Sequence, residues 1–423
     1  LGRPERVYQW NFSLQRELTS NLVVEASYTG NRANWLSVGT TAGASLQDFN
    51  AVSEETLNKL GFRVGNLDDA TLLNTLWRQL TPAQSATLQA RGVTLPYANF
   101  PTNQTVLQAI RPFPQYGGTI VPTAPIGKSW YDSFQLTVNK RFSKGLQVNA
   151  NYTLSKNLQH VSSPDVYNRS IGKDIVTANP PQVFRVSFQY EVPRPRAGMP
   201  VLGNRAVALA VGGWAISSAM FYQSAPFLGR PAAGSQNGIN RWLGRGPGGA
   251  MLRQNPDGSY MSPWSVDWVD NSGTRRTDPI DINCGCFDPE KTIVLNPAAW
   301  QAVPDGVFSP QTQQLYDFRG ARRPTESFNV ARNFRFGRES RFNLQVRVEF
   351  QNIFNRTYLP LPQGVNTLPV STTNFTAAPT RTADGRYTAG FGTFGNLRTP
   401  GAYTVGNTSA ITRSGQFIAR FQF

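Results

Sequence analysis

The sequence predicts an all-β protein, a transmembrane antiparallel β-barrel with long extracellular loops. Apolar and polar residues alternate with a period of two in about nine segments of about ten residues or more, and short turns alternate with long polar connections. No run of about 18 apolar residues occurs, which excludes a membrane-spanning helix. The 423 residues, the hydrophobic content of 39% and the mean hydropathy of −0.36 would also suit a soluble protein, so the prediction rests on the alternation.

The alternating segments group into four hairpins and a last strand. The first hairpin occupies residues 8–28, and the second occupies residues 130–154 with its turn at 143–145. The third is weaker because alanine and glycine dilute it; it joins residues 184–190 to a strand from about Val207 to Tyr222. The fourth, at residues 328–350, is the clearest, and residues 416–423 form the last strand.

The polar faces of these strands favour a water-filled lumen over the dry core of a β-sandwich, which also alternates. Charged residues stand in mid-strand on the polar side, where a sandwich core would not tolerate them. We expect these residues to face the lumen: Glu25, Arg141, Arg185, Arg347, Glu349 and Arg420. A soluble β-sandwich binding module is an alternative, which folding as a monomer without detergent would support.

The long connections predict large loops on one side of the membrane, as in outer-membrane barrels. We expect extracellular loops at residues 31–128, 157–181, 224–325 and 354–412. In the first loop, spaced leucines and valines between Ser53 and Leu80 indicate a helix or two. Aromatic residues at both ends of the apolar faces indicate the two membrane interfaces, although aromatic residues also favour strands in general.

The odd strand count predicts that other strands complete the barrel. Single-chain bacterial barrels have an even number of strands with short periplasmic turns. A first strand that starts outside therefore predicts that residues 1–423 are the C-terminal portion of a larger barrel, completed by an upstream segment or a partner chain. A strand overlooked in loop 31–128 is the alternative. Leu1 to Arg6 show no basic and apolar leader, so we expect a mature form or a missing upstream part.

Several segments resemble those of a known family. The last strand ends in Phe423 with Phe417 and Phe421 at alternate positions, and it resembles the signature by which bacterial outer-membrane proteins reach the barrel-assembly machinery. Five other segments look like the barrel half of TonB-dependent receptors, most of all the Oar-like members with a carboxypeptidase-regulatory-like domain: Tyr8–Phe12, Ala26–Gly30, Tyr131–Leu136, Asn151–Lys156 and Glu349–Asn355. The similarity covers nearly every strand but not the long loops.

This resemblance implies a 22-stranded barrel in the outer membrane of a Gram-negative bacterium, with an N-terminal plug and a TonB box that couples opening to the proton-motive force. Residues 1–423 show no plug and no TonB box. The implied function is that of an outer-membrane receptor or transporter for an unidentified ligand, with TonB acting through the plug. The alternative is a structural or surface-interaction protein whose barrel anchors the loops. A plug and TonB box upstream in the same gene would favour the first.

The two cysteines predict a disulfide rather than a metal site. Cys284 and Cys286 lie in loop 224–325, which would face the oxidising exterior. A bond across one residue is strained, but Gly285 gives the backbone room; free thiols and a metal site are the alternatives. Four acidic residues nearby suit calcium in type but not in EF-hand spacing, so we expect a solvated loop: Asp278, Asp281, Asp288 and Glu290.

Residues for catalysis are scarce, so we expect no enzyme, cofactor or metal. His160 is the single histidine and begins a polar loop, which excludes a persuasive Ser-His-Asp set. Gly244–Gly249 is not a phosphate-binding loop, because no strand and helix flank it.

Binding is expected in the loops and at the membrane surface. Candidate ligand contacts, by stacking and forked hydrogen bonds, are Trp242, Arg245, Trp264 and Trp268, with ordinary loop packing as the alternative. The net charge of +16 is scattered rather than clustered, which favours outer-membrane lipid, above all the phosphates of lipopolysaccharide, over nucleic acid.

Overall fold

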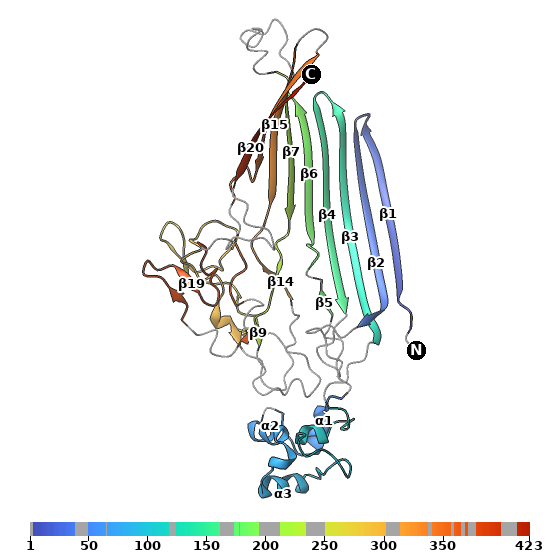
Figure 1. Ribbon diagram of the computed structural model, residues 1–423, viewed down its shortest axis with the longest axis vertical. Coiled ribbons are helices and arrows are strands. Elements are labelled where there is room, and N and C mark those ends of the chain that lie inside the picture. Colours follow the sequence, from blue (N-terminus) through green and yellow to red (C-terminus); the bar gives the residue numbers. More distant parts are fainter. Residues whose placement is uncertain are drawn as a thin grey trace.

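A tall antiparallel sheet, with folded loop segments at one of its ends, dominates the computed structural model (Figure 1). The structure describes residues 3–38, 50–64, 66–117, 124–160, 173–176, 178–193, 212–233, 250–301, 314–336, 341–356, 359–364, 369–370, 378–398 and 413–423. We call the end of the sheet that carries the long connections the loop end, and the opposite end the turn end.

Nine long strands make up the sheet in the order β1-β2-β3-β4-β6-β7-β15-β16-β20, and the short β5 (Asp174–Ile175) pairs with β4. Every neighbouring pair is antiparallel. The long strands are β1 (Arg6–Thr19), β2 (Leu22–Val38), β3 (Ala124–Ser143), β4 (Leu146–His160), β6 (Gln182–Glu191), β7 (Trp214–Gln223), β15 (Thr325–Phe336), β16 (Phe342–Gln351) and β20 (Ser414–Gln422). The predicted all-β class and the nine alternating strands are confirmed.

The strand bounds differ from the prediction at the loop end. β2 continues to Val38 and β3 begins at Ala124, so the predicted loop 31–128 was too long at both ends. β4 likewise runs to His160, four residues into the predicted loop 157–181. These extensions lack the clean alternation of the strand centres, which is why the pattern missed them. The predicted strand start near Val207 lies outside the described residues.

The register turns the alternation of the sequence into two distinct faces, because residues opposite each other in a ladder share a face. One row of paired residues is apolar and runs across six strands: Leu14, Ala26, Leu136, Tyr152, Phe184 and Tyr222. The adjacent row, on the other face, is polar: Gln15, Glu25, Thr137, Asn151 and Arg185. We call these the apolar face and the polar face.

The residues expected to face a lumen all stand on the polar face. Glu25 and Arg185 share one row, and Arg141 follows Thr137 by an even number of residues. Arg347, Glu349 and Arg420 belong to the polar rows of β16 and β20. Within these rows Arg347 forms an ion pair with Glu349, and Gln416 donates a hydrogen bond to Glu349.

Phenylalanines gather on the apolar face at the turn end. The ring of Phe336 lies 5.7 Å from that of Phe342 and 6.1 Å from that of Phe421, and Phe423 stacks 6.2 Å beyond Phe421. Three of these residues are exposed, Phe336 by 48%, Phe421 by 51% and Phe423 by 90%, whereas Phe342 is half-buried. An exposed apolar patch of this kind belongs in contact with lipid or with another protein.

Residues 50–117, in the first long connection, form a helical unit with its own core. Its elements are α1 (Glu54–Lys59), α2 (Leu67–Asn74), η1 (Trp77–Gln79), α3 (Pro82–Ala90) and α4 (Val106–Ala109). Ser53, Asn66, Thr81 and Thr105 cap the four α-helices, and the core includes Leu57, Phe62, Leu73, Leu88 and Val106. Helices within 53–80 are confirmed, whereas α3 and α4 were not predicted. No described helix is long and apolar enough to cross a membrane.

The connections β7–β15 and β16–β20 pack together into a second unit, which we call the loop unit. Its core draws Leu228, Leu295, Trp300 and Phe318 from the first connection and Phe391 and Phe394 from the second. Its short elements are β8 (Phe227–Gly229), β9 (Ala232–Ala233), β10 (Met251–Leu252), β11 (Trp268–Val269), β12 (Arg275–Arg276), η3 (Pro297–Ala299), β13 (Trp300–Gln301), β14 (Gln314–Arg319), β17 (Pro369–Val370), β18 (Thr380–Arg381) and β19 (Tyr387–Ala389).

A charge on the apolar face tests the assignment of the two faces. Val348 pairs with Val330 and Phe417 on the apolar face, whereas Asn329, beside Val330, pairs with Glu349 on the polar face. We expect Val348→Arg to lower the free energy of unfolding in lipid vesicles by about 2–4 kcal/mol, because the charge would lie in hydrocarbon, and Asn329→Arg to have a small effect. Urea titrations measure both changes, and equal losses would contradict the assignment.

Candidate ligand-binding cleft

A cleft of about 1360 Å³ opens where the loop ends of β6 and β7 meet the loop unit. Figure 1 shows that the loop ends of these two strands are directed toward the segments that carry β14 and β9. One wall comes from the sheet, through Tyr152, Gln182, Phe184 and Tyr222. The facing wall comes from the loop unit, through Trp264, Ile280, Ile282, Phe287 and Leu359. The cleft therefore exists only where the loops fold back on the sheet.

The sheet wall of the cleft is the part of the apolar face nearest the loop end. Phe184 and Tyr222 are opposite each other in the ladder, and their rings stack with centroids 6.2 Å apart and an interplanar angle of 27°. Tyr152 stands beside Phe184 in the same row. Tyr152, Phe184 and Tyr222 thus contribute an aromatic wall to the cleft.

A buried carboxylate, that of Glu326, forms an ion pair with Arg356 in the cleft lining. Glu326 is 1% exposed, and its carboxylate accepts a hydrogen bond of 2.9 Å from Tyr222 Oη and two from Arg356 Nε, at 2.9 and 3.0 Å. Asn352 fixes Arg356 in turn, because its side chain bonds both the N–H and the C=O of Arg356. A buried carboxylate is tolerated only when it is paired in this way. Glu326 thereby ties β7, β15 and the segment after β16 together.

Cations outnumber carboxylates in the lining. Arg319 donates a hydrogen bond of 3.2 Å to the carbonyl of Ala225 and lies 3.6 Å from the ring centroid of Phe227. Arg322 is exposed, and its backbone N–H donates to Asn283 Oδ1 at 2.7 Å. With Arg356, these arginines face a single lining carboxylate, that of Asp281. The described lining therefore carries an excess of positive charge beside aromatic surface.

A disulfide holds the turn at the rim of the cleft. Cys284 and Cys286 are bonded, with Sγ atoms 1.98 Å apart, and Gly285 between them lines the cleft at a φ of 62°. Asn271 binds this turn from outside, donating its N–H to the carbonyl of Cys286 and its Nδ2 to that of Gly285. The pairing is the one expected from the spacing of the cysteines.

Trp264 and Trp268, two of the predicted ligand contacts, take different places in the structure. Trp264 lines the cleft and packs on Phe318 with ring centroids 5.3 Å apart. Trp268 is 6% exposed and donates from Nε1 to the carbonyl of Asp278, so it acts mainly as a core residue. Trp242 and Arg245 lie outside the described residues.

The sequence did not single out the cleft's arginines or connect its strand aromatics to them. Tyr222 and Arg356 are far apart in the chain, and only the ladder from β7 through β15 to β16 brings them together. The loop segments carry no periodic pattern that predicts their packing. Among the described residues, no group of three or more His, Cys, Asp or Glu is placed to hold a metal.

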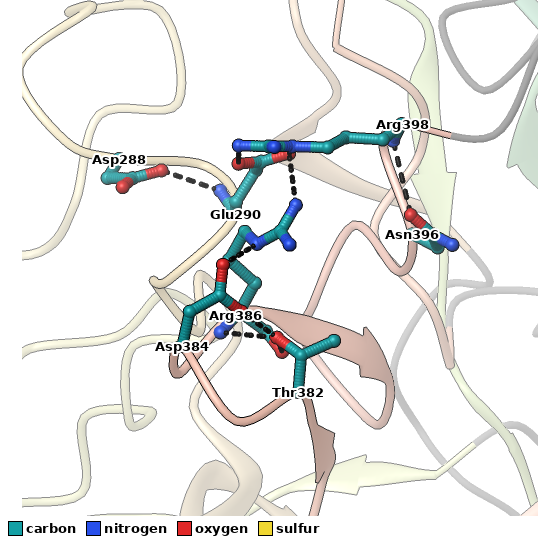
Figure 2. Close-up of polar contacts among 7 residues, drawn as sticks. All are labelled: Asp288, Glu290, Thr382, Asp384, Arg386, Asn396 and Arg398. Carbon is teal, nitrogen blue, oxygen red and sulfur yellow. Dashed lines mark hydrogen bonds and ion pairs between the residues drawn. The ribbon is translucent and has the colours of Figure 1, made fainter.

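A polar network joins the two connections of the loop unit (Figure 2). Glu290 accepts a fork of hydrogen bonds from Arg398, at 2.9 and 3.0 Å, and Arg386 lies 4.0 Å from the same carboxylate. Arg386 also pairs with Asp384 at 2.6 Å, and the backbone N–H of Tyr387 donates to the carbonyl of Glu290. The Arg398 fork holds the pKa of Glu290 below its ordinary value.

The lowered pKa of Glu290 predicts an acid-sensitive loop unit. A carboxylate whose pKa is depressed by folding contributes stability that is present above its ordinary pKa of 4.5 and is lost as the pH falls through the folded value. We expect near-ultraviolet circular dichroism to report loosening of the loop unit below pH 4.5. Glu290→Gln should remove part of this acid transition, and an unchanged transition in that variant would contradict the role of the network.

The fold has a match among family profiles. The profile described as "Outer membrane beta barrel domain" matches residues 2–395. This chain belongs to that family. Its place is the outer membrane. In barrels of that membrane the apolar face of the strands meets lipid, and the long loops lie on the outside.

Similar solved structures are distant from this barrel domain. A P. aeruginosa FpvA structure bound to heterologous pyoverdines has 9% identity and a TM-score of 0.32, over 84% of this chain and 24% of that chain. The CymD monoaromatic hydrocarbon channel has 9% identity and a TM-score of 0.19, over 82% and 60%. BamA from Haemophilus ducreyi, lacking POTRA domains 1–3, has 9% identity and a TM-score of 0.23, over 82% and 41%. No curated protein matches the sequence.

Proposed function

We propose that this chain is the C-terminal barrel portion of a TonB-dependent-receptor-like protein of the Oar-like kind, and that it takes up a ligand bound first in the cleft. The observation that carries the proposal is the cleft itself, which lies at the loop end of an outer-membrane barrel domain between aromatic rings and arginines.

The lining favours a ligand that combines a planar or sugar ring with an anionic group. Phe184, Tyr222 and Trp264 offer ring faces for stacking. Glu326 pairs with Arg356, and Arg319 and Arg322 add positive charge to the lining, where Asp281 is the one carboxylate. Guanidinium groups bind carboxylate and phosphate in forked geometry, which gives an anion both energy and orientation.

Completion of the barrel belongs to the same proposal. β1 and β20 are the edges of the sheet, and every described residue of β1 is exposed. We propose that an upstream segment or a partner chain pairs with these edges, that the polar face then lines the lumen, and that a plug in that segment couples to TonB. The exposed Phe417, Phe421 and Phe423 suit recognition by the barrel-assembly machinery.

Binding in the cleft is tested with an anionic aromatic probe. The full-length protein in lipid nanodiscs is titrated with 8-anilinonaphthalene-1-sulfonate, followed by energy transfer from tryptophan. We expect Arg322→Ala to raise the Kd roughly fivefold to tenfold, equivalent to about 1–1.4 kcal/mol. Arg335→Ala, an exposed arginine at the turn end, is the matched control. Equal affinities of the two variants would place the probe elsewhere and count against the cleft.

Uptake is tested separately in cells that produce the full-length protein. Accumulation of the probe inside the outer membrane would support transport. If a protonophore stops this accumulation while surface binding persists, the transport is energised. Surface binding without accumulation would instead support the second candidate function.

That second candidate is a surface-interaction protein anchored by its barrel. It is favoured by the helical unit, which has its own core and exposes Tyr97, Phe113 and Tyr116 by 41%, 43% and 58%. Removal of residues 50–117 separates the two functions, because it should abolish attachment to a partner cell or protein while leaving probe uptake intact.

A further inference from the structure

The apolar face of β1–β4 ends, at the loop end, in three rows rich in cations. In order along the strands, the register joins Trp10, Gly30, Asp132 and Lys156, then Tyr8, Arg32, Trp130 and Leu158, then Arg6, Asn34, Lys128 and His160. Lys173, just before β5, lies over Trp130 at 4.4 Å from the ring centroid. We call Arg6, Arg32, Lys128, Lys156 and Lys173 the basic rim.

Local contacts hold the rim residues in place. Arg32 forks onto Asp132 at 2.9 and 3.0 Å, donates to the carbonyls of Asn31 and Tyr131, and lies 5.2 Å from the ring centroid of Trp10. Tyr28 donates a hydrogen bond of 2.6 Å to Asp132. Stacking on tryptophan, which Lys173 shares, fixes the direction of a long side chain before any ligand binds.

The charges of the rim do not balance among the residues that the structure describes there. Asp132 is the one carboxylate in the three rows; it forms an ion pair with Arg32 and also interacts with the charge of Lys156 opposite it. Asp174 directly follows Lys173 and adds a second carboxylate. The five cations of the basic rim outnumber these two carboxylates. A concentration of cations of this kind attracts a multivalent anion.

The position of the rim identifies that anion. Directly toward the turn end, the same strands expose an apolar band that includes Phe12 at 71%, Leu14 at 67%, Phe134 at 44% and Leu154 at 45%. In the outer membrane this band lies in hydrocarbon, and the aromatic residues on its loop-end side, Trp10, Tyr8 and Trp130, lie at the membrane interface. The basic rim then stands at the depth of the headgroups of the outer leaflet, facing lipid rather than the lumen.

We propose that the basic rim of β1–β4 is a binding site for the headgroup phosphates of the outer-leaflet glycolipid, lipopolysaccharide. Lys156 and Lys173 supply compact ammonium charges for phosphate, and Arg6 and Lys128 extend the basic rim toward the loop end. Anionic headgroups are attracted to clusters of lysine and arginine beside a membrane in this manner. The proposal stands independently of the ligand in the cleft.

The site is tested by the lipid that the full-length protein retains. The protein is extracted from outer membranes in mild detergent, and native mass spectrometry counts bound glycolipid. We expect Lys156→Gln/Lys173→Gln to retain at least about fivefold less glycolipid than the wild type. The matched control, Arg16→Gln/Lys144→Gln, removes two charges at the turn end and should retain wild-type amounts.

The source of the phosphate is decided by two further arms. In the first arm, the wild type should bind dephosphorylated glycolipid as weakly as the Lys156→Gln/Lys173→Gln variant binds intact glycolipid. In the second arm, inorganic phosphate at millimolar concentration should not displace intact glycolipid from the wild type. Equal retention by the two double variants, retention of the dephosphorylated lipid, or displacement by inorganic phosphate alone would each overturn the proposal. Unchanged heat-modifiable migration on gels verifies that the variants are folded.

Discussion

A chain that crosses a membrane as strands must pair every backbone N–H and C=O with a neighbouring strand, because hydrocarbon offers no other partner. In this protein one continuous ladder from β1 to β20 meets that requirement between neighbouring strands and leaves the outer edges of β1 and β20 to be paired. The ladder aligns the strands so that Leu14 shares a row with Tyr222, five strands away. The apolar face, the polar face and the basic rim all depend on this register, since a shift by one residue would exchange the two faces.

At the loop end the chain is surrounded by water instead of lipid. Its backbone groups can then bond to water, so strict alternation of apolar and polar residues is no longer required. There the chain forms two units with buried cores, the helical unit and the loop unit. Their stability comes from ordinary burial of residues such as Phe62 and Trp300. The cleft lies at the boundary of the two regimes, where one wall belongs to the membrane sheet and the other to a water-soluble core.

The sequence predicted the sheet well and the cleft poorly, for physical reasons. A period of two is a local property, so residues such as Phe342 to Phe350 reveal a strand without knowledge of its neighbours. The cleft depends on contacts such as that of Tyr222 with Glu326, which are 104 residues apart and carry no local signal. The disulfide was predictable because a single residue separates Cys284 from Cys286. The pairing of Glu290 with Arg398 was not predictable, because 108 positions separate the two residues.

The fork between Glu290 and Arg398 has a consequence for how this protein is engineered. The two residues belong to connections that leave the sheet from different strands, one before β15 and one after β16. Phe287 and Phe394 stack across the same boundary, with ring centroids 6.5 Å apart. The two connections therefore act as one structural unit. A loop graft from a related barrel must replace both segments together, because either segment alone would lack half of the shared core and the partner of its charged residue.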